Sequence, residues 1–368
     1  MNYTELKVHL MQKGAVFSDS ARSIMKKGKF GRIQFSDYAT TGGIVLKIGT
    51  QFYVNVPVRF DHTPFSVEAE ENRFFLKMNS DVLPIEVEYI PAPKYALDNM
   101  LLEDGTPVRD MVMTHADRVR ISPVHGCAFH CQFCTCNTQR YMNITIEKLD
   151  AAFQIALNDA YNKPRHILIS GGTPENTVES YAYTNQVFRF FSQKYSHMEF
   201  DVMLSPRGLY PNKNSVEDYR DFLKYLRYDC NAETMSINLE LYNENYRKKY
   251  VPEKYEIGKD NYFSFIREAV RIFGDNKIRS SLIVGLEEKV DTLRAVQKLT
   301  DIGCIPVLSA FIPAVETFMA RYPAPSTDFL LEVVYEAHKL AVRANMQLGP
   351  ICKPCSHNSL TMEEGLFH

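Results

Sequence analysis

The chain has 368 residues, of which 45% are hydrophobic, 23% charged and 12% aromatic. At roughly 100–200 residues per domain, this length predicts two or three domains, or one large barrel with an appendage. The composition excludes a disordered or fibrous protein. The 42 lysines and arginines nearly balance the 44 aspartates and glutamates, so the chain lacks the basic surplus typical of nucleic-acid-binding proteins.

The eight cysteines are unevenly distributed. Four lie in residues 127–136, two close the chain at Cys352 and Cys355, and Cys230 and Cys304 stand alone. The N-terminal residues contain no apolar core of the signal-peptide type, and no stretch is apolar enough to span a membrane. A tight cysteine cluster in such a chain favours metal ligation over a disulfide scaffold. We therefore expect a cytoplasmic protein without a membrane partner.

Residues 1–112 are predicted to form a small β-rich accessory domain. Gly43–Ile48 and Phe52–Val58 flank a Gly-Thr turn and predict a hairpin, while Phe74–Met78 and Ile85–Ile90 are further period-two segments. Prolines 91 and 93 and the stretch 103–107 predict a linker to the next domain.

Residues 113–345 alternate between short apolar runs and amphipathic helices, which predicts a parallel α/β sheet, either open or closed into a (β/α) barrel. Such sheets place their chemistry at the carboxyl ends of the strands. A last helix is expected from about Thr327 to Asn345, followed by an extension at 346–368 that carries Cys352 and Cys355. The expected strands are Val119–Ser122, His166–Ser170, Phe200–Leu204, Met235–Leu239, Ser281–Val284 and Pro306–Phe311.

Three cysteines, Cys127, Cys131 and Cys134, follow the first strand of this unit within eight residues. Three thiolates on one loop can hold a cubane iron–sulfur cluster and leave its fourth iron open to a small chelating molecule. The alternative is a zinc or structural iron–sulfur knuckle with His130 or Cys136 as the fourth ligand.

Cys127, Cys131, Phe133 and Cys134 resemble the Cys-x-x-x-Cys-x-aromatic-Cys motif of the radical S-adenosylmethionine (SAM) superfamily. The resemblance implies a partial or full (β/α) barrel and a 4Fe-4S cluster held by the three cysteines, with SAM on the open iron. It also implies that one electron from the reduced cluster cleaves SAM to a 5′-deoxyadenosyl radical, which abstracts hydrogen from a substrate. Oxygen sensitivity and a reducing partner such as flavodoxin or ferredoxin follow from this chemistry.

Further segments resemble cofactor contacts of the same superfamily, and their order along the chain is that of the family. Gly171, Gly172 and Thr173 follow the second strand, where a Gly-Gly-Glu-Pro motif binds the SAM amino group, with Thr173 in place of the glutamate. Asn238, Glu240 and Arg247 resemble the contacts that the biotin-synthase-like branch makes to the SAM ribose and carboxylate. Ile283 and Gly285 resemble the superfamily segment that supports the adenine, beside Phe133.

Cys352 and Cys355 form a Cys-x-x-Cys pair after the last expected helix. If Met346–Leu348 forms a further strand, the pair lies at the open end of the barrel, near the reaction centre, where one thiol is a candidate catalytic hydrogen donor. Alternatively, the pair binds a second metal or cluster with His357 or another cysteine, or consists of ordinary reduced cysteines.

The functional prediction is a radical SAM enzyme that acts on a small molecule in a biosynthetic pathway. No basic tail or appended RNA-binding barrel is evident, so we expect no nucleic-acid partner. The lack of a cysteine-rich extension disfavours the peptide-modifying branch, and the lack of a cobalamin-binding domain disfavours the corresponding methyltransferases. One alternative is aminocarboxypropyl transfer from SAM, which would yield methylthioadenosine. Another is a binding protein in which a zinc ion or cluster only holds the structure.

Overall fold

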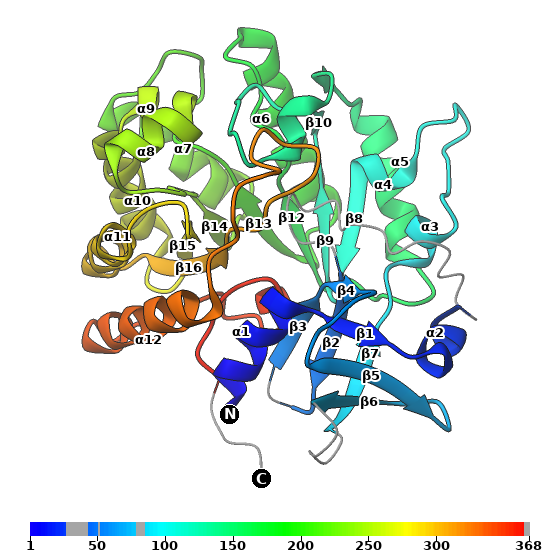
Figure 1. Ribbon diagram of the computed structural model, residues 1–368. Coiled ribbons are helices and arrows are strands. Elements are labelled where there is room, and N and C mark those ends of the chain that lie inside the picture. The colour runs from blue at the N-terminus through cyan, green and yellow to red at the C-terminus, as the bar shows by residue number, and fades with distance from the viewer. Residues whose placement is uncertain (27–42, 51, 79–84, 364–368) are drawn as a thin grey trace.

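The computed structural model describes residues 1–26, 43–50, 52–78 and 85–363, and it contains two seven-stranded sheets (Figure 1). The N-terminal sheet lies at the amino ends of the parallel strands of the second sheet (Figure 1). No helix in the described ranges is long and apolar enough to cross a bilayer.

The N-terminal sheet has the strand order β3-β2-β7-β6-β5-β1-β4. Antiparallel pairing of β2 with β3 places Ile44 opposite Val56, which confirms the predicted hairpin. Alternate residues of β2 are buried, as expected for a strand with one face on a core. The strands are β1 (Ala15–Phe17), β2 (Ile44–Ile48), β3 (Phe52–Val56), β4 (Val58–Arg59), β5 (Phe65–Glu70), β6 (Arg73–Met78) and β7 (Ile85–Ile90).

Helices α1 (Tyr3–Lys13) and α2 (Asp19–Lys26) pack against this sheet. The short helices α3 (Lys94–Leu97) and α4 (Val108–Met111) lie in the connection that follows, where α4 contacts α5 (Ile146–Leu157) and β8 (Val112–His115) of the second half of the molecule. Helix α1 begins with a capping box in which the side chains of Asn2 and Glu5 each accept from the other's backbone amide. The chain then enters the second sheet at β8, so residues 1–112 remain our proposed accessory domain.

The second sheet is a partial barrel with the order β16-β15-β14-β13-β12-β9-β8. Six strands from β9 to β16 run parallel in chain order, and β8 adds an antiparallel edge to β9. All six expected strands are confirmed, and the sheet remains open between β8 and β16. The strands are β8 (Val112–His115), β9 (Arg118–Ile121), β12 (His166–Ile169), β13 (Glu199–Met203), β14 (Thr234–Ser236), β15 (Ile278–Val284) and β16 (Ile305–Ala310).

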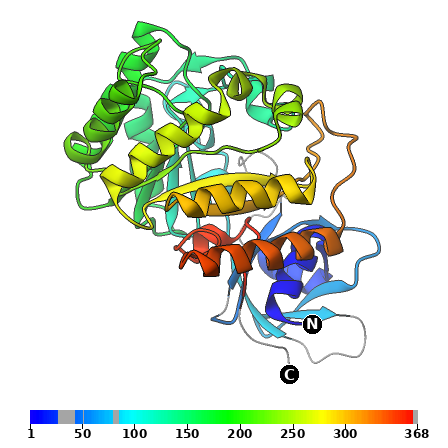
Figure 2. The same cartoon turned by 90° about the vertical axis from the view of Figure 1, so that its left-hand side faces the viewer.

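Helices between the strands cover the outside of this partial barrel (Figures 1 and 2). A capping box of Ser215 and Asp218 starts α7, and Gly274 ends α10. The helices are α5 (Ile146–Leu157), α6 (Val178–Lys194), α7 (Val216–Lys224), α8 (Glu244–Tyr250), α9 (Pro252–Ile257), α10 (Lys259–Phe273), α11 (Lys289–Asp301) and α12 (Thr327–Arg343), with the π-helical η2 (Tyr225–Asp229) extending α7.

The C-terminal segment, residues 346–363, crosses the amino end of the partial barrel and joins it to the N-terminal sheet. The Leu360 amide donates to the Leu308 carbonyl at 2.7 Å, and the Asn55 amide donates to the His357 carbonyl at 2.7 Å. Residues 346–348 form no strand, contrary to the conditional expectation. The segment includes the short helix η3 (Pro354–Ser356), and residues 364–368 of the expected extension lie outside the described ranges.

Candidate active site

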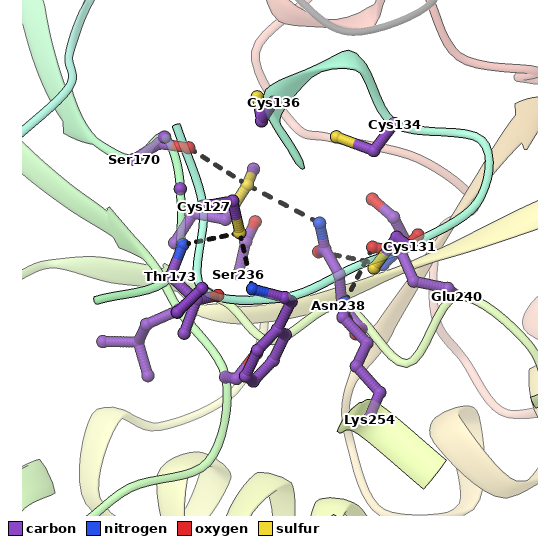
Figure 3. A pocket seen from close by; sticks show the side chains of 18 of the residues that line it. Cys127, Cys131, Cys134, Cys136, Ser170, Thr173, Ser236, Asn238, Glu240 and Lys254 are labelled. Carbon is purple, nitrogen blue, oxygen red and sulfur yellow. Dashed lines mark hydrogen bonds and ion pairs between the residues drawn. The ribbon is translucent and has the colours of Figure 1, made fainter. Parts of the chain in front are cut away.

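A cavity of about 840 Å³ lies inside the partial barrel. At the carboxyl ends of the strands it is lined by Cys127, Cys131, Cys134 and Cys136. Figure 3 shows these four side chains around one end of the cavity. At the amino ends, the C-terminal segment contributes its floor through Pro350, Cys355, Asn358 and Ser359.

The cysteine loop connects the two-stranded pair β10 (Val124–His125) and β11 (Met142–Asn143) and includes the 3₁₀ turn η1 (Thr135–Thr138). The sulfur of Cys127 accepts hydrogen bonds from the Phe129 amide at 3.3 Å and the Thr173 amide at 3.1 Å. The Ala128 amide in turn donates to the Thr173 carbonyl at 3.0 Å. These bonds fix the loop against the end of β12.

Gly171, Gly172 and Thr173, the predicted contacts of the SAM amino group, all line the cavity. Gly172 has to be glycine because a Cβ there would lie 1.7 Å from the Gly126 carbonyl oxygen and 2.8 Å from Cα of Cys127. The glycines therefore allow β12 to approach the backbone of the cysteine loop itself.

The cysteine loop fits a multi-iron cluster better than a single metal ion. Among the described residues, its thiols form no set of three whose sulfurs all lie within 4.8 Å of one another, which a mononuclear site requires. A cubane cluster places its thiolates further apart, on separate irons. Burial raises the pKa of Cys131 to about 12, so this sulfur is a thiol until metal binds and releases the proton.

One wall of the cavity near the thiols is apolar. Phe133 and Ile283, both predicted cofactor contacts, line the cavity and belong to a buried cluster that also includes Cys131 and Phe311. Such a wall offers a flat ligand an apolar surface and excludes water from the neighbouring sulfurs.

A polar wall faces the cavity from the end of β14, where Ser236, Asn238 and Glu240 alternate as predicted. The Lys254 ammonium donates to Oε1 of Glu240 at 2.9 Å and to the Asn238 carbonyl at 2.8 Å. Although burial alone would lower the pKa of Lys254, the Glu240 carboxylate raises it overall, so the ammonium stays charged. Sequence reasoning missed Lys254, which lies in helix α9 and follows no strand.

Arg247 does not lie where the sequence placed it. Its side chain is fully buried outside the cavity lining. Nη1 donates to the carbonyls of Leu239 and Leu241 at 3.1 and 3.0 Å, and Nη2 donates to the Lys254 carbonyl at 2.6 Å. The guanidinium therefore holds the loop after β14 against α9, and the expected contact with a SAM carboxylate does not fit this geometry.

Gly285 is also absent from the cavity lining. Its φ of 105° belongs to the left-handed region, and a Cβ there would lie 2.6 Å from Cγ of Pro325. The glycine thus lets the turn after β15 pack on the segment before α12, in place of the predicted contact with the cofactor.

Cys352 and Cys355 lie at the opposite end of the barrel from the position that the sequence suggested. They contact Asp117 and His166, which precede β9 and begin β12 at the amino ends of these strands. The cluster thiols are at the carboxyl ends, so a catalytic role for Cys352 or Cys355 as hydrogen donors at the reaction centre does not fit.

Three arginines line the cavity from the strands: Arg118, Arg120 and Arg279. Arg279 forms an ion pair with Asp201 on β13. Arg118 and Arg120 alternate along β9, so they share one face of the strand. A parallel strand that is covered on both sides is normally apolar throughout, and this alternation was the signal in the sequence that could have revealed them.

The radical SAM superfamily model matches residues 121–300. Residues 121–300 are a radical SAM domain. The matched segment includes the cysteine loop, the glycines after β12 and both walls of the cavity. A radical SAM domain implies cleavage of SAM with an iron–sulfur cluster, and Cys127, Cys131 and Cys134 lie within the matched residues of this enzyme.

Several solved structures are distantly similar to this radical SAM protein. A radical SAM methyltransferase from Sphaerobacter thermophilus shares 15% identity over 82% of each chain, with a TM-score of 0.48. An FeFe-hydrogenase maturase from Carboxydothermus hydrogenoformans shares 15% identity over 63% of this chain and 52% of its own, with a TM-score of 0.44. Methylornithine synthase shares 14% identity over 70% and 76%, with a TM-score of 0.43. No curated protein sequence matches the chain.

Proposed function

We propose that this radical SAM enzyme abstracts a hydrogen atom from a small anionic molecule enclosed in its barrel. The observation that carries the proposal is one cavity of about 840 Å³ that has the three motif thiols at one end and arginines of β9 among its lining residues. That volume lies in the range of roughly 300–1,000 Å³ of sites for small molecules.

When bound, the 4Fe-4S cluster and SAM would supply a one-electron cleavage of a sulfonium C–S bond, with methionine and a 5′-deoxyadenosyl radical as products. The radical would become 5′-deoxyadenosine by taking a hydrogen atom from a C–H bond of the substrate. Cys127, Cys131 and Cys134 are the proposed ligands of three irons. The electron comes from a reducing partner such as flavodoxin or ferredoxin.

The two walls of the cavity have different proposed roles toward SAM. Phe133 and Ile283 offer an apolar surface to the adenine, and Asn238 and Glu240 offer polar groups to the ribose. Lys254 is the buried cation nearest to this polar wall, held at Glu240 by a 2.9 Å contact, and it takes the role of neutralising SAM's carboxylate that the sequence assigned to Arg247.

Arg118 and Arg120 are the proposed binding groups for an anionic part of the substrate. Arginine binds a carboxylate or phosphate through two parallel hydrogen bonds, which fixes orientation as well as affinity. These side chains come from β9 itself, and the cysteine loop follows the carboxyl end of that strand. An anion bound to the arginines therefore leaves the rest of a small substrate directed toward the cluster end of the cavity.

The test uses reconstituted protein under anaerobic conditions with SAM, dithionite and metabolites from cells grown in deuterated water, separated by anion exchange. We expect the 5′-deoxyadenosine formed from SAM to contain deuterium when the enzyme is given the metabolite fraction that the column retains. Arg118→Gln and Arg120→Gln should each reduce this transfer about tenfold or more, because each removes hydrogen bonds between charged groups, while the exposed Arg343→Gln should leave it unchanged.

Two outcomes would contradict the proposal. Deuterium transfer only from the unretained fraction would exclude an anionic substrate. Methylthioadenosine in place of 5′-deoxyadenosine would indicate aminocarboxypropyl transfer.

A further inference from the structure

A second group of metal-binding side chains lies at the amino end of the barrel, apart from the cysteine loop. Asp117, His166, Cys352 and Cys355 each direct one ligand atom to a common point, and these four atoms all lie within 4.8 Å of one another. Nε2 of His166 is 3.6 Å from the sulfur of Cys355 and 4.0 Å from that of Cys352. Oδ1 of Asp117 is 3.7 Å from the sulfur of Cys352 and 3.5 Å from Nε2 of His166.

Three of these four distances, 3.5, 3.6 and 3.7 Å, match the edges of one tetrahedron, and the fourth, 4.0 Å, is slightly longer. With ligand bonds of about 2.0–2.3 Å, tetrahedral zinc separates its ligand atoms by about 3.3–3.8 Å. A cubane cluster needs ligand atoms on separate irons and therefore further apart. Two thiols, one imidazole and one carboxylate are all ligands that zinc accepts, and a set of four protein ligands is typical of a structural site.

Arg165 orients the Asp117 ligand without a metal. Asp117 lies in the two-residue turn between β8 and β9, and its carbonyl accepts from the Arg165 amide at 2.7 Å. Nε of Arg165 donates to Oδ2 of the same aspartate at 3.0 Å, which leaves Oδ1 directed at His166. Contacts of this kind fix a ligand's orientation in known metal sites.

We propose that Asp117, His166, Cys352 and Cys355 bind one zinc ion, which fastens the C-terminal segment to the floor of the barrel. Two ligands come from the strand ends and two from the segment that supplies Pro350, Asn358 and Ser359 to the cavity lining. The ion thus holds closed the end of the cavity that is opposite the cluster. This structural site does not depend on the reaction proposed above.

The test is metal analysis of the purified, reconstituted full chain. We expect about one zinc ion per chain in addition to about four irons. Cys352→Ser combined with Cys355→Ser should reduce zinc at least fivefold while iron and the visible absorption of the cluster stay unchanged. Cys304→Ala, which removes a buried cysteine that is not part of this group, should keep both metals.

Cobalt substitution provides a second readout that does not depend on activity. Cobalt in the wild-type site should give thiolate charge-transfer and tetrahedral visible bands that the double variant lacks. Absence of stoichiometric zinc, zinc that the double variant retains, or a loss of about four irons on changing Cys352 and Cys355 would each overturn the proposal. Failure of the reaction proposed above would appear instead as missing 5′-deoxyadenosine with both metals present.

Discussion

The backbone amide of Thr173 donates a hydrogen bond to the sulfur of Cys127 at 3.1 Å. This contact joins the turn after β12 to the loop that carries all three motif cysteines. Hydrogen bonds to a ligand sulfur are one of the means by which a protein sets the reduction potential of an iron–sulfur cluster. The close approach that allows this bond depends on the missing side chain of Gly172.

Gly172→Ala is expected to prevent correct cluster assembly, because its Cβ would collide with the Gly126 carbonyl in the cysteine loop. Iron content after reconstitution should fall severalfold, measured by iron and sulfide analysis. Gly274→Ala is the control, since its φ of 92° is strained but the space around it is open. It should cost about 1–2 kcal/mol of stability and leave the iron content unchanged.

Glu240→Gln is expected to weaken SAM binding about tenfold. The substitution removes the charge that compensates the buried Lys254 ammonium, and a hydrogen bond between charged groups contributes about 1.5–3 kcal/mol. The measurement is the Kd for SAM of the reconstituted protein by anaerobic calorimetry. The control is Glu336→Gln, which changes an exposed ion pair with Lys289 of the same 2.9 Å length. If Glu336→Gln weakened SAM binding as much as Glu240→Gln does, the effect of Glu240 would not be local.

Arg247→Lys separates a structural role from a binding role for this residue. Lysine cannot reach the three carbonyls that the planar guanidinium now contacts, so we expect a loss of about 2 kcal/mol or more of stability. The Kd for SAM of the folded, reconstituted variant should stay close to that of the wild type. A large rise in that Kd with unchanged thermal stability would instead support the original prediction from the sequence.

Lys7 is expected to make stability depend on alkaline pH. Burial lowers its pKa from the ordinary value of 10.5, even though Glu363 at 2.8 Å opposes the shift. Between the lowered pKa and 10.5 the unfolded chain binds more protons than the folded one, so this residue's contribution to the free energy of unfolding increases as the pH rises.

Thermal unfolding of the wild type and Lys7→Met across pH 8–10 tests this sign. The Tm of the wild type should rise relative to that of the variant as the pH increases, and a relative fall would contradict the assignment. The exposed Lys13→Met is the control and should show no such trend.

The sequence predicted the barrel well because each of its strands is a short apolar run between helices with clear caps, such as Ser215 before α7. It missed α1, although Asn2 and Glu5 have the spacing of a capping box. The strand expected at 346–348 does not form. The Met346 amide donates to the Ala341 carbonyl of α12, and the next bond to β16 comes from the Gly349 amide to the Pro306 carbonyl.

Site residues were predictable where the chemistry lies within one short segment, as in the cysteine loop. The group of Asp117, His166, Cys352 and Cys355 was not, because Cys352 and Asp117 are 235 positions apart in the chain and meet only through the fold. The role of Arg247 was misjudged because the sequence does not reveal that backbone carbonyls surround its guanidinium.

The most direct test of the catalytic account is the formation of 5′-deoxyadenosine from SAM by reconstituted protein reduced with dithionite, in the wild type, Cys134→Ala and Cys136→Ala. All four loop cysteines line the cavity, but only Cys134 belongs to the motif. We predict product from the wild type and Cys136→Ala and none from Cys134→Ala. Two results would contradict an open iron held by Cys127, Cys131 and Cys134. One is that the wild type forms no 5′-deoxyadenosine although its cluster is fully assembled. The other is that Cys136→Ala loses the product while Cys134→Ala still forms it.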